Sequence, residues 1–273
     1  MHPTRNEPRT NGCKLFITKE KMKDLVLESL QSSTYKEISK LSDEACRELC
    51  NFFLKERYSI PTLLSLYGHQ KVRRILRVHP DFALRYATEK TGGRFKRAEP
   101  YIATDPKAAF LYSCYFLKAR FIEAEPVIAK DPETAPAYYR SKIKQGRWPE
   151  AEPVFLLRAQ DALDYAKSGI KGRWPEAEPV IANDPYSAYY YAKDILKSRW
   201  PEAEPVIATA YFSAYYYAVD ILKSRFIDGE PKIMIEPYYA YLYAKDILKK
   251  RWPEAEPYIL KDSIWWKYYR ESL

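Results

Sequence analysis

The chain has 273 residues, of which 45 are Lys or Arg and 36 are Asp or Glu, so its formal net charge is +9 at pH 7. A chain of this length can bury one large core or divide into two domains. Its first twenty residues are polar and it contains no apolar run of about eighteen residues. These features predict neither a signal peptide nor a membrane span, so we expect a cytoplasmic protein without a membrane partner.

The excess of positive charge is concentrated near the N-terminus. Residues 1–93 carry 17 basic and 11 acidic side chains, against 28 and 25 in the longer remainder. A basic surface attracts phosphate groups and acidic partners, although net charge alone identifies neither. We therefore expect any phosphate-binding surface in this first part of the chain.

The four cysteines do not form a pattern that is typical of disulfides or of zinc sites. They are Cys13, Cys46, Cys50 and Cys114, and the three histidines supply no matching pair of metal ligands. We expect reduced, partly buried thiols, no metal site and no cofactor.

The N-terminal part predicts a tail followed by a small helical domain. Residues 1–12 are polar and contain two prolines, which indicates a disordered tail. Residues 13–67 predict the helical domain. Its helices are expected over residues 17–31, 33–41 and 42–57, with Thr18 and Ser42 as N-caps.

Residues 18–62 also resemble, in the order of their helices, a helix-turn-helix segment of DNA-binding proteins. The resemblance implies base contacts by Arg47 and Asn51 and backbone contacts by Lys55 and Arg57. Lys71, Arg73, Arg74 and Arg77 add positive charge shortly afterwards. However, the turn lacks a glycine, and Asp43 and Glu44 repel phosphate. We therefore favour a helical cap for the repeats that follow.

From residue 68 to residue 273 one pattern recurs about every 26 residues. The phrase RWPEAEP occurs at residues 147–153, 173–179, 199–205 and 251–257. Its opening arginine recurs in looser copies too, giving Arg94, Arg120, Arg147, Arg173, Arg199, Arg225 and Arg251. An earlier, degenerate copy of the unit begins near Gly68. A fixed period of this size indicates a solenoid of stacked units.

Each unit predicts a short helix, a tight turn and a longer helix. In residues 173–198, Pro179 belongs in the first turn of a short helix over about residues 177–183. Asp184 and Pro185 then predict the N-cap and first position of a second helix of about 14 residues. Such hairpins bury their apolar stripes only by stacking. The fold class is therefore an all-α, right-handed αα-solenoid of about seven to eight hairpins over residues 68–273.

Two neighbouring columns of the aligned units behave differently. One is tyrosine throughout: Tyr86, Tyr112, Tyr139, Tyr165, Tyr191, Tyr217, Tyr243 and Tyr269. It predicts rings packed between hairpins with their hydroxyls on polar partners. The adjacent column varies: Arg85, Leu111, Tyr138, Asp164, Tyr190, Tyr216, Leu242 and Tyr268. A position that varies between stacked copies faces either solvent or a partner that does not repeat.

The glutamates of RWPEAEP favour architecture over catalysis. Only the second glutamate, the second proline and the opening arginine occur in all seven units that begin with this arginine. This pattern predicts a structural ion pair, such as Arg173 with Glu178, that fixes the angle at the joint between hairpins. Catalysis needs one constellation of groups with distinct roles. No such set or nucleotide-binding motif occurs, so we do not expect an enzyme.

The hairpin pattern resembles αα-solenoids such as tetratricopeptide and HEAT arrays, although the unit is shorter. The wording R-W-P-E-A-E-P-x-I also resembles repeats of uncharacterised bacteriophage proteins. These resemblances cover about three quarters of the chain. They imply a binding scaffold without a known active site, and a phage product that acts on a host target.

Three functional hypotheses remain open. The first is a scaffold that binds a macromolecule, in the first place a protein, through variable residues Tyr138, Asp164, Tyr190, Tyr216 and Tyr268. The second is nucleic-acid binding through the basic N-terminal residues. The third is the capture of a nucleotide or another small signal molecule between tyrosines.

Overall fold

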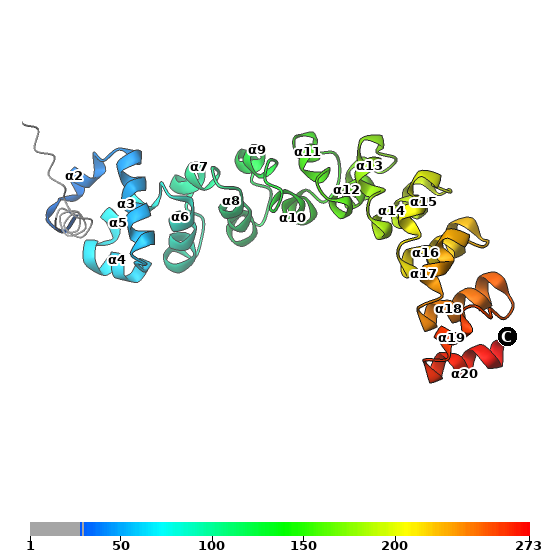
Figure 1. Cartoon of the computed structure of the whole chain (residues 1–273). Coiled ribbons are helices and arrows are strands. Elements are labelled where there is room, and N and C mark those ends of the chain that lie inside the picture. Colours follow the sequence, from blue (N-terminus) through cyan, green and yellow to red (C-terminus); the bar gives the residue numbers. More distant parts are fainter. Residues whose placement is uncertain (1–27, 29) are drawn as a thin grey trace, which may run out of the picture. The chain divides into compact units, whose positions relative to one another are not determined.

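The computed structural model describes residues 28 and 30–273, which form only helices, turns and loops (Figure 1). The predicted all-α class is confirmed for this part of the chain. The predicted tail over residues 1–12, the cap Thr18, Cys13 and most of the predicted helix over 17–31 lie outside the described residues.

The chain divides into two units, Met1–Ile102 and Ala103–Leu273, which are described separately. The expected boundary between residues 67 and 68 lies inside the first unit. Its helices are α2 (Tyr35–Ser39), α3 (Asp43–Lys55), α4 (Ile60–Tyr67), α5 (His69–Leu76), α6 (Pro80–Tyr86), η1 (Ala87–Thr91), η2 (Lys96–Ala98) and α7 (Glu99–Ile102).

The core of the first unit is built around α5, which packs against α2, α3 and α4. Capping side chains start the neighbouring helices: the Ser42 hydroxyl accepts the Ala45 N–H at 3.1 Å, as predicted for that residue. Cys46 and Cys50 of α3 are fully buried free thiols. Because burial disfavours the thiolate, the pKa of both thiols is raised. These cysteines therefore act as small apolar core residues.

The second unit is a series of short and longer helices in alternation. The longer, second helices are α8 (Pro106–Tyr112), α10 (Ala135–Tyr138), α12 (Ala159–Tyr165), α14 (Pro185–Tyr191), α16 (Tyr211–Tyr217), α18 (Pro237–Tyr243) and α20 (Ser263–Ser272). Five-residue π-helical segments extend all but the last: η3 (Ser113–Leu117), η5 (Tyr139–Ile143), η7 (Ala166–Ile170), η9 (Ala192–Leu196), η11 (Ala218–Leu222) and η13 (Ala244–Leu248).

The short, first helices lie between these second helices in the chain. They are α9 (Glu125–Ile128), α11 (Glu152–Phe155), α13 (Glu178–Ile181), α15 (Glu204–Ile207), α17 (Glu230–Ile233) and α19 (Glu256–Ile259). Single 3-10 turns precede all but α19: η4 (Ile122–Ala124), η6 (Pro149–Ala151), η8 (Pro175–Ala177), η10 (Pro201–Ala203) and η12 (Ile227–Gly229).

The hairpin over residues 173–198 shows how the local sequence sets these boundaries. Pro179 lies in the first turn of α13, as predicted. The Asp184 carboxylate accepts the Ser187 N–H at 2.7 Å and caps α14, also as predicted. The second helix is shorter than expected: α14 and η9 together end at Leu196, because Lys197 adopts a left-handed conformation with φ of 53°.

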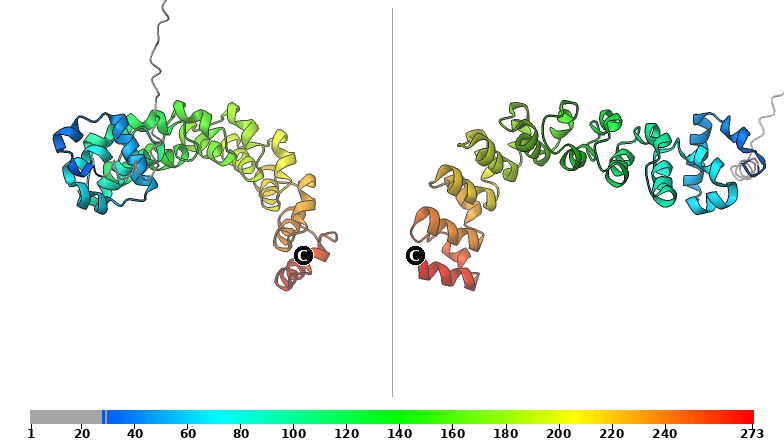
Figure 2. Two further views of the ribbon diagram at one scale, coloured as in Figure 1. Left: turned by 60° about the vertical axis from the view of Figure 1, so that its left-hand side comes forward. Right: turned by 180° about the vertical axis from the view of Figure 1, so that it is seen from behind.

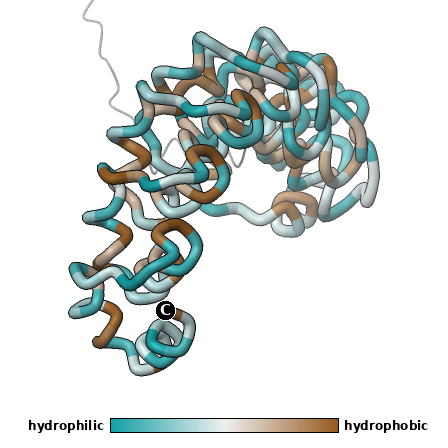
Figure 3. Tube along the Cα trace, turned by 90° about the vertical axis from the view of Figure 1, so that its right-hand side faces the viewer, coloured by the Kyte–Doolittle hydropathy of each residue, from teal (hydrophilic) through white to brown (hydrophobic). Residues whose placement is uncertain are grey.

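The hairpins stack in sequence order, which confirms the predicted helical repeat. In Figures 1 and 2 the helices α12, α14, α16 and α18 follow one another. The first helices α9, α13, α15, α17 and α19 each pack against the preceding second helix. The close approach depends on small residues, because Ala177, Ala188, Ala203 and Ala214 are fully buried. Figure 3 shows apolar segments recurring along the trace, as expected where each hairpin buries a stripe against its neighbours.

One register assignment was wrong. The unit that begins at Arg120 has one extra residue, and we had placed Tyr139 in the constant tyrosine column. The structure places the extra residue after the left-handed Lys144, in the loop that contains Gly146. Tyr138 is therefore the member of the constant column, and Ala137 takes the variable position.

Candidate partner-binding face

The constant tyrosines anchor each hairpin internally. The Tyr191 hydroxyl accepts the Trp174 N–H at 2.7 Å and donates to Glu178 Oε1 at 3.1 Å. The same two contacts are made by Tyr138, Tyr165, Tyr217, Tyr243 and Tyr269. These six rings are buried, which confirms the predicted core role of Tyr165, Tyr191, Tyr217, Tyr243 and Tyr269.

The persistent arginine and glutamate complete this arrangement. Arg173 donates from Nε to Glu178 Oε1 at 2.6 Å and from a terminal nitrogen to Oε2 at 3.0 Å. All seven predicted pairs, from Arg94–Glu99 to Arg251–Glu256, are present with closest N···O distances of 2.6–2.9 Å. We call each set of arginine, glutamate and tyrosine a tyrosine joint. It connects the entry of a hairpin to its first and second helices.

The joint changes the acidity of its members. The pKa of Glu178 is below its ordinary value, mainly because Arg173 donates hydrogen bonds to the carboxylate. Burial raises the pKa of Tyr191 to about 12. The glutamate is thus held as a carboxylate whose oxygens are already occupied by internal donors. The contacts give this carboxylate a structural role.

The variable column lies at the surface in the C-terminal hairpins. Tyr268 is 50% exposed, and Tyr190 and Tyr216 are half-buried. Asp164 is also half-buried and accepts a hydrogen bond from the Gln160 amide at 2.9 Å. The assignment of Tyr138 to a partner-binding surface was wrong, since its side chain is wholly buried in a tyrosine joint.

Further rings, which the comparison of columns missed, join this surface. We define the aromatic face as those exposed and half-buried rings of α14, α16, α18 and α20 that contact one another: Tyr186, Tyr190, Tyr211, Phe212, Tyr216, Tyr238, Tyr239, Trp265 and Tyr268. Neighbouring hairpins are linked by ring contacts, with centroids 5.6 Å apart for Tyr186–Phe212 and 5.0 Å for Tyr211–Tyr239. Tyr238–Trp265 continues the series at 4.6 Å.

A sequence signal for some of these rings was present. Tyr186 stands four residues before Tyr190, and Phe212 stands four residues before Tyr216, so each pair shares one helical face. In the earlier hairpins the position of Tyr186 holds Lys107, Glu133 and Gln160. The change from polar to aromatic residues along this column could have located the face.

Charged side chains of η7, η9 and η11 pair with one another between hairpins. Lys167 contacts Asp194 at 2.5 Å, and Lys193 contacts Asp220 at 2.8 Å. The Tyr189 hydroxyl also donates to Asp220. Lys167 and Lys193 are therefore already paired with carboxylates within the protein.

The residues predicted to contact nucleic acid fall into three groups in the first unit. Arg47, Asn51, Lys55 and Arg57 are exposed on α3 or just after it, with Arg47 3.5 Å from Glu44. Lys71 and Arg74 serve the fold: Lys71 donates to the Leu30 carbonyl and Arg74 donates to the Leu41 carbonyl. Arg73 and Arg77 line a pocket, which is treated below.

The first residue of the expected recognition helix is also part of the fold. Asp43 accepts a hydrogen bond from the Tyr101 hydroxyl at 2.5 Å and lies 3.3 Å from Arg74. The hydrogen bond from Tyr101 is the main cause of the lowered pKa of this carboxyl group. Asp43 therefore stays charged and ties α3 to α5 and α7.

Two further observations concern what the described residues lack. Residues 28 and 30–273 contain no group of three or more His, Cys, Asp or Glu side chains arranged to hold a metal ion. Within the same part of the chain, no helix has the length and apolar character needed to cross a bilayer.

No protein-family model, curated protein or solved structure matches this chain. The described structure is that of an all-α helical-repeat solenoid.

Proposed function

We propose that this protein is a non-enzymatic repeat scaffold that binds a protein partner through the aromatic face. The observation that carries the proposal is the continuous run of accessible rings across four successive hairpins. Monomeric proteins rarely expose large contiguous apolar surfaces without a binding role. Tyrosine and tryptophan are also enriched where proteins recognise one another.

The pairing of charges favours a protein over a nucleic acid at this face. Nucleic-acid binding draws most of its affinity from basic side chains that neutralise phosphates. Lys167 and Lys193 already contact Asp194 and Asp220, so they contribute little free positive charge. A partner with apolar side chains and hydrogen-bonding groups fits the tyrosines better.

The different positions of the constant and the variable tyrosines support the same proposal. The constant tyrosines place their hydroxyls in the tyrosine joints, whereas Tyr216 and Tyr268 leave part of the ring at the surface. A rigid amphipathic ring loses little conformational entropy on binding. The resemblance of the repeat to those of bacteriophage proteins makes a host protein our candidate partner.

The test is quantitative capture of partners by three forms of the full chain. The wild type is compared with the double variant Tyr216→Ala/Tyr268→Ala, and bound proteins are measured by mass spectrometry. Ile122→Ala/Ile227→Ala is the control, because both isoleucines are exposed but precede first helices. We expect one partner to be lost with the tyrosine variant alone. Equal recovery by all three forms contradicts the proposal.

A further inference from the structure

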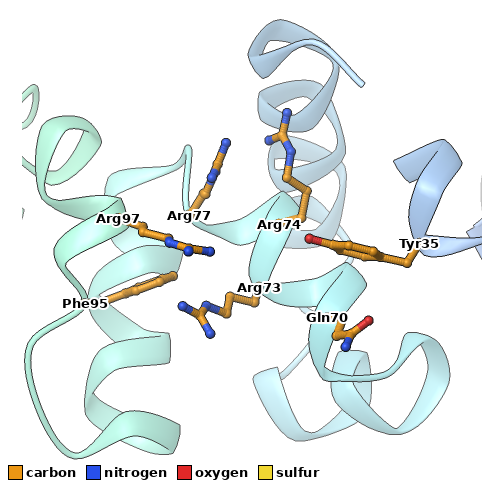
Figure 4. A pocket seen from close by; sticks show the side chains of 7 residues that line it. All are labelled: Tyr35, Gln70, Arg73, Arg74, Arg77, Phe95 and Arg97. Carbon is orange, nitrogen blue, oxygen red and sulfur yellow. The ribbon is translucent and has the colours of Figure 1, made fainter. Parts of the chain in front are cut away.

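A second candidate site lies in the first unit, apart from the aromatic face. It is a pocket of about 240 Å³ whose lining includes four arginines, Arg73, Arg74, Arg77 and Arg97, together with Tyr35 and Phe95 (Figure 4). Three elements supply these residues: α2 contributes Tyr35, α5 and its C-terminal end contribute three arginines, and η2 contributes Arg97. Four arginines therefore line this one cavity, which makes it a positively charged site.

The arginines have different degrees of internal contact. Arg74 is an anchor, because it donates to the Leu41 carbonyl at 2.6 Å and contacts Asp43 at 3.3 Å. Among the described residues, no carboxylate lies within salt-bridge distance of Arg73, Arg77 or Arg97. Nε of Arg77 is buried and has no hydrogen-bond partner in this part of the chain. A buried donor without an acceptor is costly, so an acceptor from a ligand would stabilise it.

Arg73 is held where a ligand can meet it. Its guanidinium lies over the Phe95 ring, 5.5 Å from the centroid. Figure 4 shows the ends of Arg73 and Arg97 close to this ring, with the Tyr35 side chain directed toward them from α2. The cation–π contact orients the guanidinium and leaves its N–H groups free to donate.

Arg97 departs from the rule that the other repeats follow. In the six later units the corresponding position is always acidic: Glu123, Glu150, Glu176, Glu202, Asp228 and Glu254. A glutamate at this place would neutralise part of the charge of Arg73 and Arg77. The unit that begins at Arg94 instead has an arginine at this position, which increases the electrostatic repulsion among Arg73, Arg77 and Arg97. Architecture alone does not explain this reversal.

We propose that this pocket binds a small anion with two or three linked phosphate groups. Guanidinium groups donate two parallel hydrogen bonds to phosphate oxygens, which makes arginine well suited to such ligands. Three positive charges without a described carboxylate partner favour a ligand of several negative charges over a single carboxylate. The four arginines line one cavity of about 240 Å³, and a cavity of this size favours a compact ligand over a nucleic-acid backbone.

The decisive variant is Arg97→Glu, which restores the residue type of the other repeats. Binding of inorganic pyrophosphate and of a nucleoside triphosphate to the full chain is measured by calorimetry at low salt. Arg47→Glu is the matched control, since it makes the same change of charge at an exposed site of the same unit. We expect Arg97→Glu to weaken binding by at least about tenfold and Arg47→Glu to leave it nearly unchanged.

A second variant separates geometry from charge. Arg73→Lys/Arg97→Lys keeps both positive charges but removes the forked donors, so we expect it to weaken pyrophosphate binding as well. Tighter binding of the nucleotide than of pyrophosphate identifies a nucleoside phosphate, with Tyr35 contacting the base. Similar affinities identify the phosphate chain alone as the ligand.

Three results would overturn the proposal. One is the absence of pyrophosphate and nucleotide binding by the wild type. Another is an equal loss of affinity in Arg47→Glu, which would show that general electrostatic attraction explains the binding. The third is binding of a single-stranded oligonucleotide alone, which would reassign the arginines to a nucleic-acid surface. Circular dichroism of each variant verifies that the fold is retained.

Discussion

At the scale of single residues, neighbouring tyrosines on one helix have opposite roles. Tyr217 is fully buried and its hydroxyl joins a backbone N–H to a carboxylate. Tyr216, one residue earlier, is half-buried and contacts other rings of the aromatic face. The helix turns the two side chains in different directions, and this explains why one column is constant and the other varies.

The adjacent pair gives a matched prediction. Tyr217→Phe removes the hydroxyl and leaves the Trp200 N–H and one Glu204 oxygen without that partner. We expect the free energy of unfolding to fall by about 1–3 kcal/mol, the usual cost of an unsatisfied buried group. Tyr216→Phe, the control, should change it by less than about 0.5 kcal/mol. Denaturant titration monitored by circular dichroism measures both; equal effects would contradict the assigned roles.

The tyrosine joints also predict how stability depends on pH. The pKa of Glu178 and of Glu204 is below the ordinary value of 4.5, so their contribution is complete above pH 4.5 and is lost as pH falls through the lowered pKa. The pKa of Tyr191 is raised from 10.0 to about 12, so its contribution is lost as pH rises through this range. Melting temperatures measured across pH should therefore decline at both ends.

A variant assigns the acid side of this profile. Glu178→Gln removes one titrating group, so we expect a lower melting temperature at neutral pH and a shallower decline below pH 4.5. An unchanged acid slope would show that other carboxylates control acid unfolding.

At the scale of helices, the ends of the second helices carry a recurring strain. Lys118, Lys144, Lys171, Lys197, Lys223 and Lys249 all have positive φ values. A left-handed conformation costs a residue with a Cβ atom roughly 1–2 kcal/mol, and glycine avoids this cost. In the degenerate unit that precedes Arg94, the equivalent position is Gly92, with a φ of 60°.

Lys197→Gly should therefore stabilise the second unit. We expect the free energy of unfolding to rise by about 1 kcal/mol, since the strain is relieved while the loop geometry is kept. Lys197→Ala removes the same charge but keeps a Cβ atom, so it should give no such gain. Thermal unfolding of the two variants tests this, and a gain with alanine alone would point to charge rather than backbone strain.

The order of short and longer helices could be predicted from the sequence, but the π-helical and 3-10 segments and some helix ends could not. Pro179 and Asp184 fixed the starts of α13 and α14 because proline and an acidic cap have strong local preferences. The end at Leu196 was missed because lysine gives no signal for a left-handed turn. Tyr138 was misassigned because the position of the extra residue depends on the loop after Lys144.

At the scale of the whole molecule, the repeat period was sufficient to predict the architecture of residues 103–273. The stacking of most first helices on the preceding second helix follows from hairpins that cannot bury their apolar stripes alone. The candidate sites were less predictable. The aromatic face extends over rings of several columns, and the arginine pocket combines residues from α2, α5 and η2 that are distant in sequence. Such convergence depends on tertiary packing.

The central claim is that the surface rings of the last hairpins contact a protein partner. Site-specific photo-cross-linking in native extract tests it most directly, with a photoreactive phenylalanine analogue placed singly at Tyr190, Tyr216, Tyr268 or Ile227. We expect one protein to cross-link from the three tyrosine positions and not from Ile227, which is 69% exposed and precedes a first helix. Cross-linking of nucleic acid alone, or of the same proteins from all four positions, would contradict it.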